Sequence, residues 1–191
     1  QALKQEYVVA KKKSAKPMLW ISMISMVMFF AGLTSAYVIS MKRDDWVSFD
    51  LPQAFIVSTV LIVVSSITLF LSQRFLKQDK RQISLLLLVI TLFLGIGFIW
   101  QQYVGFNQLK SIGLFFTGPE STVSTSFIIG ITFLHVLHLL AGVIVLLVVI
   151  YNHFKYKYKS DDMLGFELSA IFWHFVDILW IYLFFFFSFI K

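Results

Sequence analysis

Carboxylate and imidazole side chains within an apolar stretch near the C-terminus are the residues of this sequence best placed to do chemistry. Glu167, His174 and Asp177 lie in segment 164–190, which is long and apolar enough to cross a lipid bilayer. A charged group at membrane depth costs free energy, so such residues predict a functional or structural polar site. Intervals of seven and three residues place these three side chains on or near one face of a helix.

The preceding apolar segment carries two further histidines. His135 and His138 are three residues apart near the middle of segment 124–151, so they share a helix face. The connection to the next segment is short, which predicts that the two helices are antiparallel neighbours. We therefore expect one of these two histidines to hydrogen-bond with His174 or Asp177. The predicted polar network between the two helices consists of His135, His138, Glu167, His174 and Asp177.

Three kinds of site are compatible with such a network. It could fix two helices in register, conduct protons, or ligate a redox metal or a haem. Packing is favoured, because polar pairs between membrane helices are common and each contributes only ~0.6 kcal/mol. Two histidines three residues apart, with one more on a neighbouring helix, do not give the opposed pairs that a bis-histidine haem needs. No cysteine or methionine spacing indicates copper. We predict no catalytic, cofactor-binding or metal-binding residue in this chain.

The composition excludes a water-soluble domain. Of the 191 residues, 59% are hydrophobic and only 14% are charged, and the mean hydropathy is +0.83. A chain of this length cannot bury that much apolar surface in a soluble core, which indicates an integral membrane protein. The net charge of +6 does not indicate nucleic-acid binding, because the basic residues lie in the connections between apolar segments. With no cysteine, the chain has neither a disulfide framework nor a thiolate metal site.

Five apolar segments have the length of transmembrane helices. Alternate connections carry twelve Lys and Arg on one side of the membrane and four on the other, so the positive-inside rule predicts a cytoplasmic N-terminus and a periplasmic C-terminus. The first apolar run is too long for a signal-peptide core and is expected to remain as an anchor. The predicted fold is an all-α membrane protein. It has a basic cytoplasmic segment, 1–16, and a five-helix domain, 17–191, with spans at about 17–41, 52–75, 82–106, 124–151 and 164–190.

Basic residues at the predicted cytoplasmic ends of these segments form a second candidate site. A Lys or Arg near an anionic membrane surface contributes ~1 kcal/mol of binding free energy. Aromatic residues at the same interface, such as Trp20 and Phe75, could flank the glycerol region of a lipid. The predicted contacts with lipid headgroups are Lys16, Arg74, Lys77 and Arg81.

Several motifs together resemble one family, subunit III of the haem–copper terminal oxidases, chiefly cytochrome c oxidase. The most specific motif is Glu167 followed by the run 173–177, Trp-His-Phe-Val-Asp, and then Trp180. The resemblance extends from about residue 17 to residue 190, and the short five-span form is similar to bacterial members. Weaker matches are Ile24, Ser25, Phe29, Phe30 and Gly32, then Leu94, Gly95, Phe98 and Gln102, and then His135, His138 and Gly142.

The sequence departs from the family pattern at three positions. Met26 stands where members commonly have a Glu in the first core helix, and Gly105 stands where a Glu often follows the third-helix Gln. Val136 replaces the usual Gly after the first histidine of the pair. A role that needs a carboxylate at the level of Met26 is therefore not expected of this chain.

The resemblance implies a non-catalytic subunit that packs against the catalytic subunit I and supports sustained turnover and proton uptake. Haem and copper are then expected in the partner subunits. Structural phospholipid is expected in a cleft between the first two helices of this chain and the remaining three. The chain alone has no expected catalytic centre, whereas the complex would be a proton-translocating cytochrome-c oxidase of aerobic respiratory electron transport. Other oxidase subunits and membrane phospholipids are expected partners, a respiratory supercomplex is compatible, and the expected location is the bacterial inner membrane.

Alternative functions stay open at this point. Within the oxidases, the chain could be a subunit III of a quinol oxidase or an accessory relative from nitric oxide reductase. From a different class, it could be a small proton-coupled transporter that uses Glu167, His174 and Asp177 as a relay, although no broken helix and no inverted repeat supports this. A haem b membrane anchor is disfavoured by the positions of the histidines.

Overall fold

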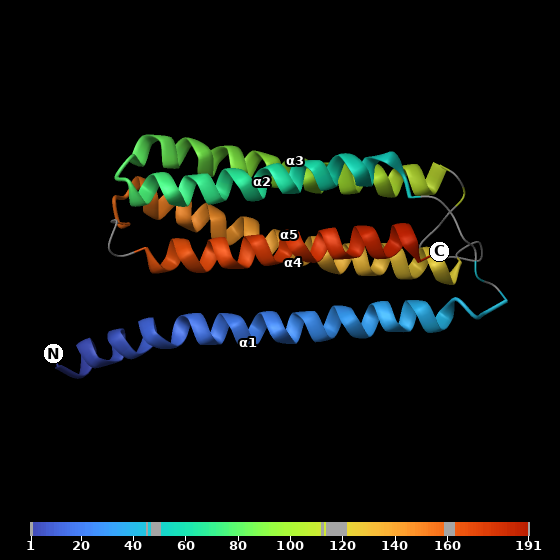
Figure 1. Ribbon diagram of the computed structural model, residues 1–191, viewed down its shortest axis with the longest axis horizontal. Coiled ribbons are helices and arrows are strands. Elements are labelled where there is room, and N and C mark those ends of the chain that lie inside the picture. Colours follow the sequence, from blue (N-terminus) through green and yellow to red (C-terminus); the bar gives the residue numbers. More distant parts are fainter. Residues whose placement is uncertain are drawn as a thin grey trace.

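Five α-helices make up most of the chain in the computed structural model, which describes residues 2–44, 46, 51–111, 113, 122–158 and 163–190 (Figure 1). Each helix contains a stretch long and apolar enough to span a bilayer, and the described residues include no β-strand. The predicted all-α membrane fold with five spanning helices is therefore confirmed. The helices are α1 (Ala2–Ser40), α2 (Gln53–Lys77), α3 (Arg81–Ser111), α4 (Val123–Phe154) and α5 (Leu164–Phe189).

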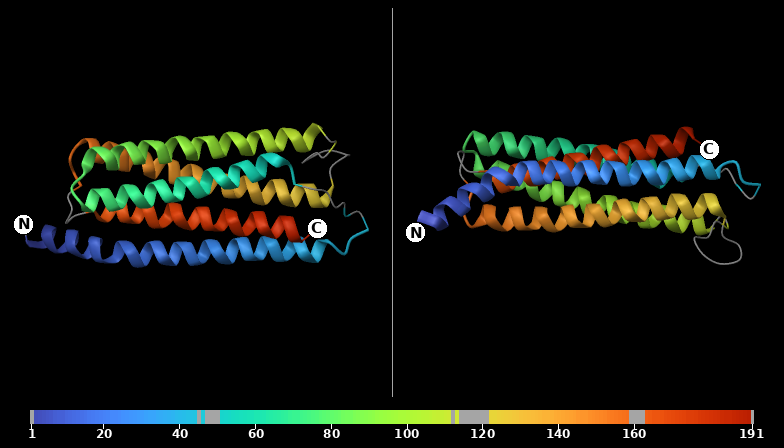
Figure 2. Two further views of the ribbon diagram at one scale, coloured as in Figure 1. Left: turned by 45° about the horizontal axis from the view of Figure 1, so that its top comes forward. Right: turned by 90° about the horizontal axis from the view of Figure 1, so that it is seen from below.

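The largest difference from the predicted spans is at the N-terminal end. α1 begins at Ala2, so the basic segment 2–16 continues the first helix. Pro17 lies inside this helix, and the turns at its N-terminal end tilt away from the rest of α1 (Figure 2). A proline within a helix removes one backbone hydrogen bond and clashes with the preceding turn, which accounts for a bend there.

The helices α2, α3, α4 and α5 form a closed ring in which each helix packs against two others (Figures 1 and 2). α1 lies outside this ring and contacts only α4 and α5 among the described helices. Because α2 packs along α3 and α5 and not along α1, the first two helices do not pair to form one wall of the expected cleft. The two chain ends lie at opposite ends of the bundle, as five membrane crossings require (Figure 1). The cytoplasmic location of the N-terminal end stays a prediction.

Trp173 of α5 is packed between three other helices of the ring. Its side chain is 1% exposed, and its indole N–H donates to the Ser65 hydroxyl of α2 at 3.0 Å. Gly95 of α3 and Gly142 of α4 leave the space that the indole fills. A Cβ atom at Gly95 would lie 2.7 Å from Cη2 of Trp173, and one at Gly142 would lie 3.3 Å from its Cε3. Small residues on α3 and α4 thus allow the helices to close around one large side chain.

Gly95→Ala should destabilise the bundle, because the added methyl group would overlap the buried Trp173 ring. We expect a loss of ~1–3 kcal/mol in the free energy of unfolding, the usual cost of overpacking a tight core. The measurement is the melting temperature of the purified protein. Gly32→Ala is the matched control, because a Cβ atom at Gly32 meets nothing within 4 Å, and alanine is the better helix former. Equal melting temperatures for the two variants would contradict the tight fit around Trp173.

Candidate functional site

His174 lies at the interface between α5 and α2. Its Nδ1 atom is 2.6 Å from the hydroxyl oxygen of Ser66, which is a short hydrogen bond between the two helices. The imidazole also lines a hollow between α2 and α5 at the surface of the bundle. The sequence predicts α4 as the partner helix of His174, whereas the ring of four helices places α2 beside α5 as well.

Asp177 is almost completely buried, with 1% of its surface exposed. Neither carboxylate oxygen has a hydrogen-bond partner among the described residues. The Ser66 hydroxyl lies near this carboxyl, but it satisfies hydrogen-bond geometry with His174 instead. Within the described part of the chain, Asp177 therefore makes no hydrogen bond that joins α5 to another helix.

His135 of α4 is fully buried among aromatic rings. Its ring centroid lies 5.2 Å from that of Trp180 and 6.0 Å from that of Phe98. In the described structure neither ring nitrogen of His135 has a hydrogen-bond partner, and the hydroxyl of Thr132, one turn away, has none either. The predicted hydrogen bond from His135 to α5 is therefore not formed, because indole and phenyl rings occupy the space around the imidazole.

His138 is hydrogen-bonded within its own helix. Its Nδ1 atom donates to the carbonyl oxygen of Leu134 at 2.7 Å. Together with the placement of His135, this means that the hydrogen bonds expected from α4 to His174 or Asp177 are absent from the described residues. The five residues of the predicted network are therefore not joined into one hydrogen-bonded cluster.

Glu167, the fifth residue of the predicted network, pairs with a residue of α1. Its Oε2 atom lies 2.6 Å from Nζ of Lys16, and the two side chains are 28% and 49% exposed. Exposed ion pairs contribute little to stability, typically below ~1 kcal/mol. The pair nevertheless connects the outlying α1 to α5 at the end of the bundle where the N-terminus lies.

Hydroxyl residues of α2, which the predicted network does not include, make hydrogen bonds with side chains of α5 and α3. The Thr59 hydroxyl accepts from the Trp180 indole N–H at 3.0 Å, and the Ser58 hydroxyl accepts from the Gln102 side-chain amide at 3.0 Å. The sequence contains the signal for them, because hydroxyl residues recur every seven positions and so share a helix face. This hydroxyl stripe consists of Ser58, Thr59, Ser65, Ser66 and Ser72.

Arg81, one of the predicted lipid contacts, is engaged within the protein. Its guanidinium donates to the carbonyl oxygens of Tyr158 at 2.9 Å and His153 at 3.3 Å, and it lies 4.6 Å from the ring centroid of Tyr156. In return, Nε2 of His153 donates to the Arg81 carbonyl at 3.2 Å. These contacts join the start of α3 to the end of α4, so Arg81 has a structural role whether or not it meets a lipid.

The other predicted lipid contacts have exposed side chains. Arg74 and Lys77 belong to the last turn of α2, and that end of α2 is at the same end of the bundle as the N-terminal end of α1 (Figure 1). The Arg74 guanidinium lies 5.8 Å from the ring centroid of Phe70, and Lys16 is the partner of Glu167. Lys77 is exposed at the last turn of α2. Headgroup binding by these residues stays a prediction.

The arrangement of the polar side chains suits helix packing better than catalysis. Among the described residues, no group of three or more His, Asp or Glu side chains is placed to hold a metal ion. The hydrogen bonds of the hydroxyl stripe link α2 to α5 and α3, and each joins neutral groups. In hydrocarbon, such bonds satisfy polar groups that would otherwise be unpaired.

Comparison with known proteins gives one consistent result. A family profile described as cytochrome c oxidase subunit III matches residues 3–190 of this chain. A relative from Pyricularia grisea, named cytochrome c oxidase subunit 3, is 32% identical over 136 residues, which cover 71% of this chain and 47% of the relative. Relatives of the same name from Yarrowia lipolytica and Pelomedusa subrufa are 30% and 29% identical over 129 residues, which cover 68% of this chain and 46% and 47% of those proteins. The chain spans about half the length of the curated relatives it matches.

The contrast between Asp177 and the hydroxyl stripe can be tested by substitution. Asp177→Asn should leave the melting temperature unchanged or raise it, because the carboxyl has no described partner to lose. Ser65→Ala should lower the stability by ~1 kcal/mol, because it leaves the buried Trp173 indole N–H without its acceptor. Both variants are compared by thermal unfolding of the purified protein. A larger loss for Asp177→Asn than for Ser65→Ala would show that the carboxyl is the more important partner.

Proposed function

Because this chain belongs to the cytochrome c oxidase subunit III family, we propose that it is a non-catalytic membrane subunit of a haem–copper oxidase in aerobic respiration. The observation that carries the proposal is the extent of the family match, which covers all five helices from residue 3 to residue 190. In this role the chain packs against the subunit that holds haem and copper, and supports its turnover and proton uptake. The oxidase activity belongs to the assembled complex.

The chain is a multi-pass membrane protein of an oxidase subunit family. We place it in the bacterial inner membrane, with the N-terminus in the cytoplasm. The excess of Lys and Arg at one end of the bundle supports this orientation. Other oxidase subunits and membrane phospholipids are its proposed partners.

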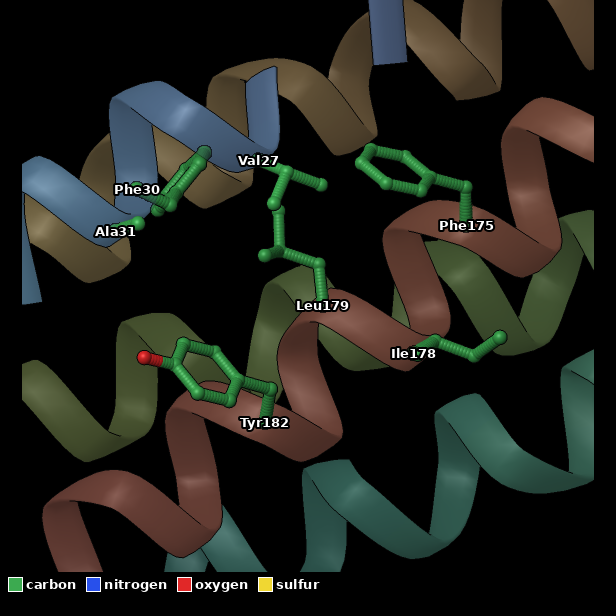
Figure 3. Close-up of a pocket in the computed structure, with 7 residues that line it drawn as sticks. All are labelled: Val27, Phe30, Ala31, Phe175, Ile178, Leu179 and Tyr182. Carbon is green, nitrogen blue, oxygen red and sulfur yellow. The ribbon is translucent and has the colours of Figure 1, made fainter. Parts of the chain in front are cut away.

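A phospholipid chain is the proposed occupant of a cavity between α1 and α5 (Figure 3). The cavity has a volume of about 320 Å³. The described residues that line it are apolar except for the hydroxyl of Tyr182, which is hydrogen-bonded to Thr34 at 3.1 Å. Lys16 precedes Val27 on α1 by eleven residues, about 16 Å along a helix. A headgroup beside Lys16 could therefore place its acyl chain in the cavity. The lining residues are Val27, Phe30, Ala31, Phe175, Ile178, Leu179 and Tyr182.

The proposed assembly can be tested by purifying the complex through a tag on this chain. We expect the visible absorption spectrum of a haem protein and a large membrane partner, because the chain is proposed to pack against the haem-containing subunit. Mass spectrometry of the partner identifies it. A colourless protein that purifies alone would refute the proposal and would favour the proton-coupled transporter.

The lipid proposal predicts a defect that appears only during sustained turnover. Ala31→Phe fills the cavity and should displace the lipid, so the oxidase should inactivate faster during continuous turnover while its initial rate changes little. Gly32→Phe adds the same bulk at the next position, where a Cβ atom meets nothing within 4 Å, and should behave as wild type. Bound phospholipid is measured by mass spectrometry beside the inactivation rate. Unchanged lipid content and unchanged lifetime in Ala31→Phe would refute lipid binding in this cavity.

A further inference from the structure

A second hollow lies on the side of α5 that faces α2. It has a volume of about 340 Å³ and is distinct from the cavity between α1 and α5, although Ile178 borders both. In Figure 3, Ile178 extends toward the side of α5 on which α2 lies. Among the described residues that line this hollow, only Ser66 and His174 have polar side chains, and they are hydrogen-bonded to each other. Its lining residues are Ser66, Ile67, Phe70, His174 and Ile178.

This hollow lies close to the middle of the membrane. Ser66 is within one or two residues of the centre of α2, and His174 is within three residues of the centre of α5. At about 1.5 Å per residue, both are only a few ångströms from the midpoint of their helices. The hydrocarbon region is about 30 Å thick, so its centre is roughly 15 Å from the headgroups and ester carbonyls on either side. Lipid at this depth offers only hydrocarbon.

The hydrogen-bonding capacity of His174 is only half used. Nδ1 is bonded to Ser66, whereas Nε2 has no partner among the described residues and is not enclosed by the protein. If Nδ1 accepts from the Ser66 hydroxyl, Nε2 carries a proton that needs an acceptor. If Nδ1 donates to Ser66, Nε2 is an acceptor that needs a donor. In either tautomer, a polar nitrogen at the centre of the membrane requires a partner that lipid tails cannot supply.

We propose that this hollow is the docking site for a transmembrane helix of another oxidase subunit, which places a neutral hydroxyl or amide side chain against Nε2 of His174. This inference rests on the proposed function for the existence of such a subunit. Ser, Thr, Tyr, Asn and Gln both donate and accept, so they fit either tautomer, and a charged side chain is disfavoured at this depth. Ile67, Phe70 and Ile178 are 54%, 51% and 65% exposed, so they offer apolar surface to the same helix.

The test uses photo-crosslinking in the assembled complex. A photoreactive phenylalanine analogue is placed at Ile67, which lines the hollow and is exposed. Illumination in native membranes is followed by purification and mass spectrometry of the adduct. We expect a crosslink to a transmembrane segment of a second subunit, within one or two helical turns of a hydroxyl or amide residue. An adduct with lipid or with an isoprenoid quinone, or no adduct, would overturn the proposal.

Substitution of His174 separates hydrogen bonding from bulk. His174→Phe keeps an aromatic ring but removes both nitrogens, so it should reduce the crosslink yield from Ile67 about threefold, as expected for one hydrogen bond between membrane helices. His174→Gln keeps a donor and an acceptor and should restore most of the yield. Leu137→Phe provides the matched control at a similar depth on the exposed face of α4, and should leave the yield unchanged. Equal yields in the wild type, His174→Phe and His174→Gln would overturn the role of the imidazole.

The outcome also distinguishes this inference from the proposed function. A wild-type complex that contains haem but gives no protein crosslink from Ile67 would overturn the docking site alone. A wild-type protein that purifies without haem or any partner subunit would overturn the proposed function and this inference with it.

Discussion

The indole of Trp173 reaches from α5 toward α2, α3 and α4 at once, and the positions of those three helices depend on it. The ring occupies space that Gly95 and Gly142 leave free, and its N–H is satisfied by Ser65. In a bilayer, helices gain little from burying apolar surface against one another, because lipid is equally apolar. Shape and hydrogen bonding must therefore hold the ring of helices together, and Trp173 provides both. Trp180 repeats the arrangement two turns later, with its N–H on Thr59.

The hydroxyl stripe of α2 sets the register between α2 and α5, because it accepts hydrogen bonds from these two tryptophans. Both indoles donate to hydroxyls on the same helix, and the acceptors Thr59 and Ser65 lie on the face that meets α5. A slip of α5 by one turn would leave two indole N–H groups in hydrocarbon without acceptors, which costs far more than the bonds themselves contribute. The serines and threonines of α2 thus favour this arrangement of the bundle over similarly packed arrangements in which the helices are shifted along one another. α1 lies outside the ring and is joined to α5 by the Thr34–Tyr182 hydrogen bond and the Lys16–Glu167 ion pair.

The number of the helices and the positions of their membrane-spanning parts follow from hydropathy, because about 20 consecutive apolar residues between polar connections have the length that crosses a bilayer. The extension of α1 back to Ala2 does not follow from it, because that segment is polar and basic. The hydrogen-bond partners of the polar residues cannot be derived from hydropathy. Chain order suggests that His135 and His174 are on adjacent helices, and they are, yet α5 also borders α2, whose hydroxyls take its hydrogen bonds. Ring closure is a three-dimensional property that no local pattern encodes. The sequence shows the hydroxyl repeat of α2, but a serine in a membrane helix also bonds readily to its own backbone, so the repeat does not by itself identify the residues it meets.

Histidines at similar depth have different consequences for the assembled protein. His135 is enclosed by rings, so any cost of its unpaired nitrogens belongs to this chain and is the same whether or not a partner is present. His174 has one nitrogen satisfied by Ser66 and one that has no hydrogen-bond partner among the described residues. A partner that supplies the missing group binds the folded chain and not the unfolded one, so it stabilises the fold by mass action. The stability of the α2–α5 interface is therefore coupled to assembly through a single imidazole. Its Nδ1 atom bonds to Ser66 of α2, and its Nε2 atom is proposed to bond to the partner helix.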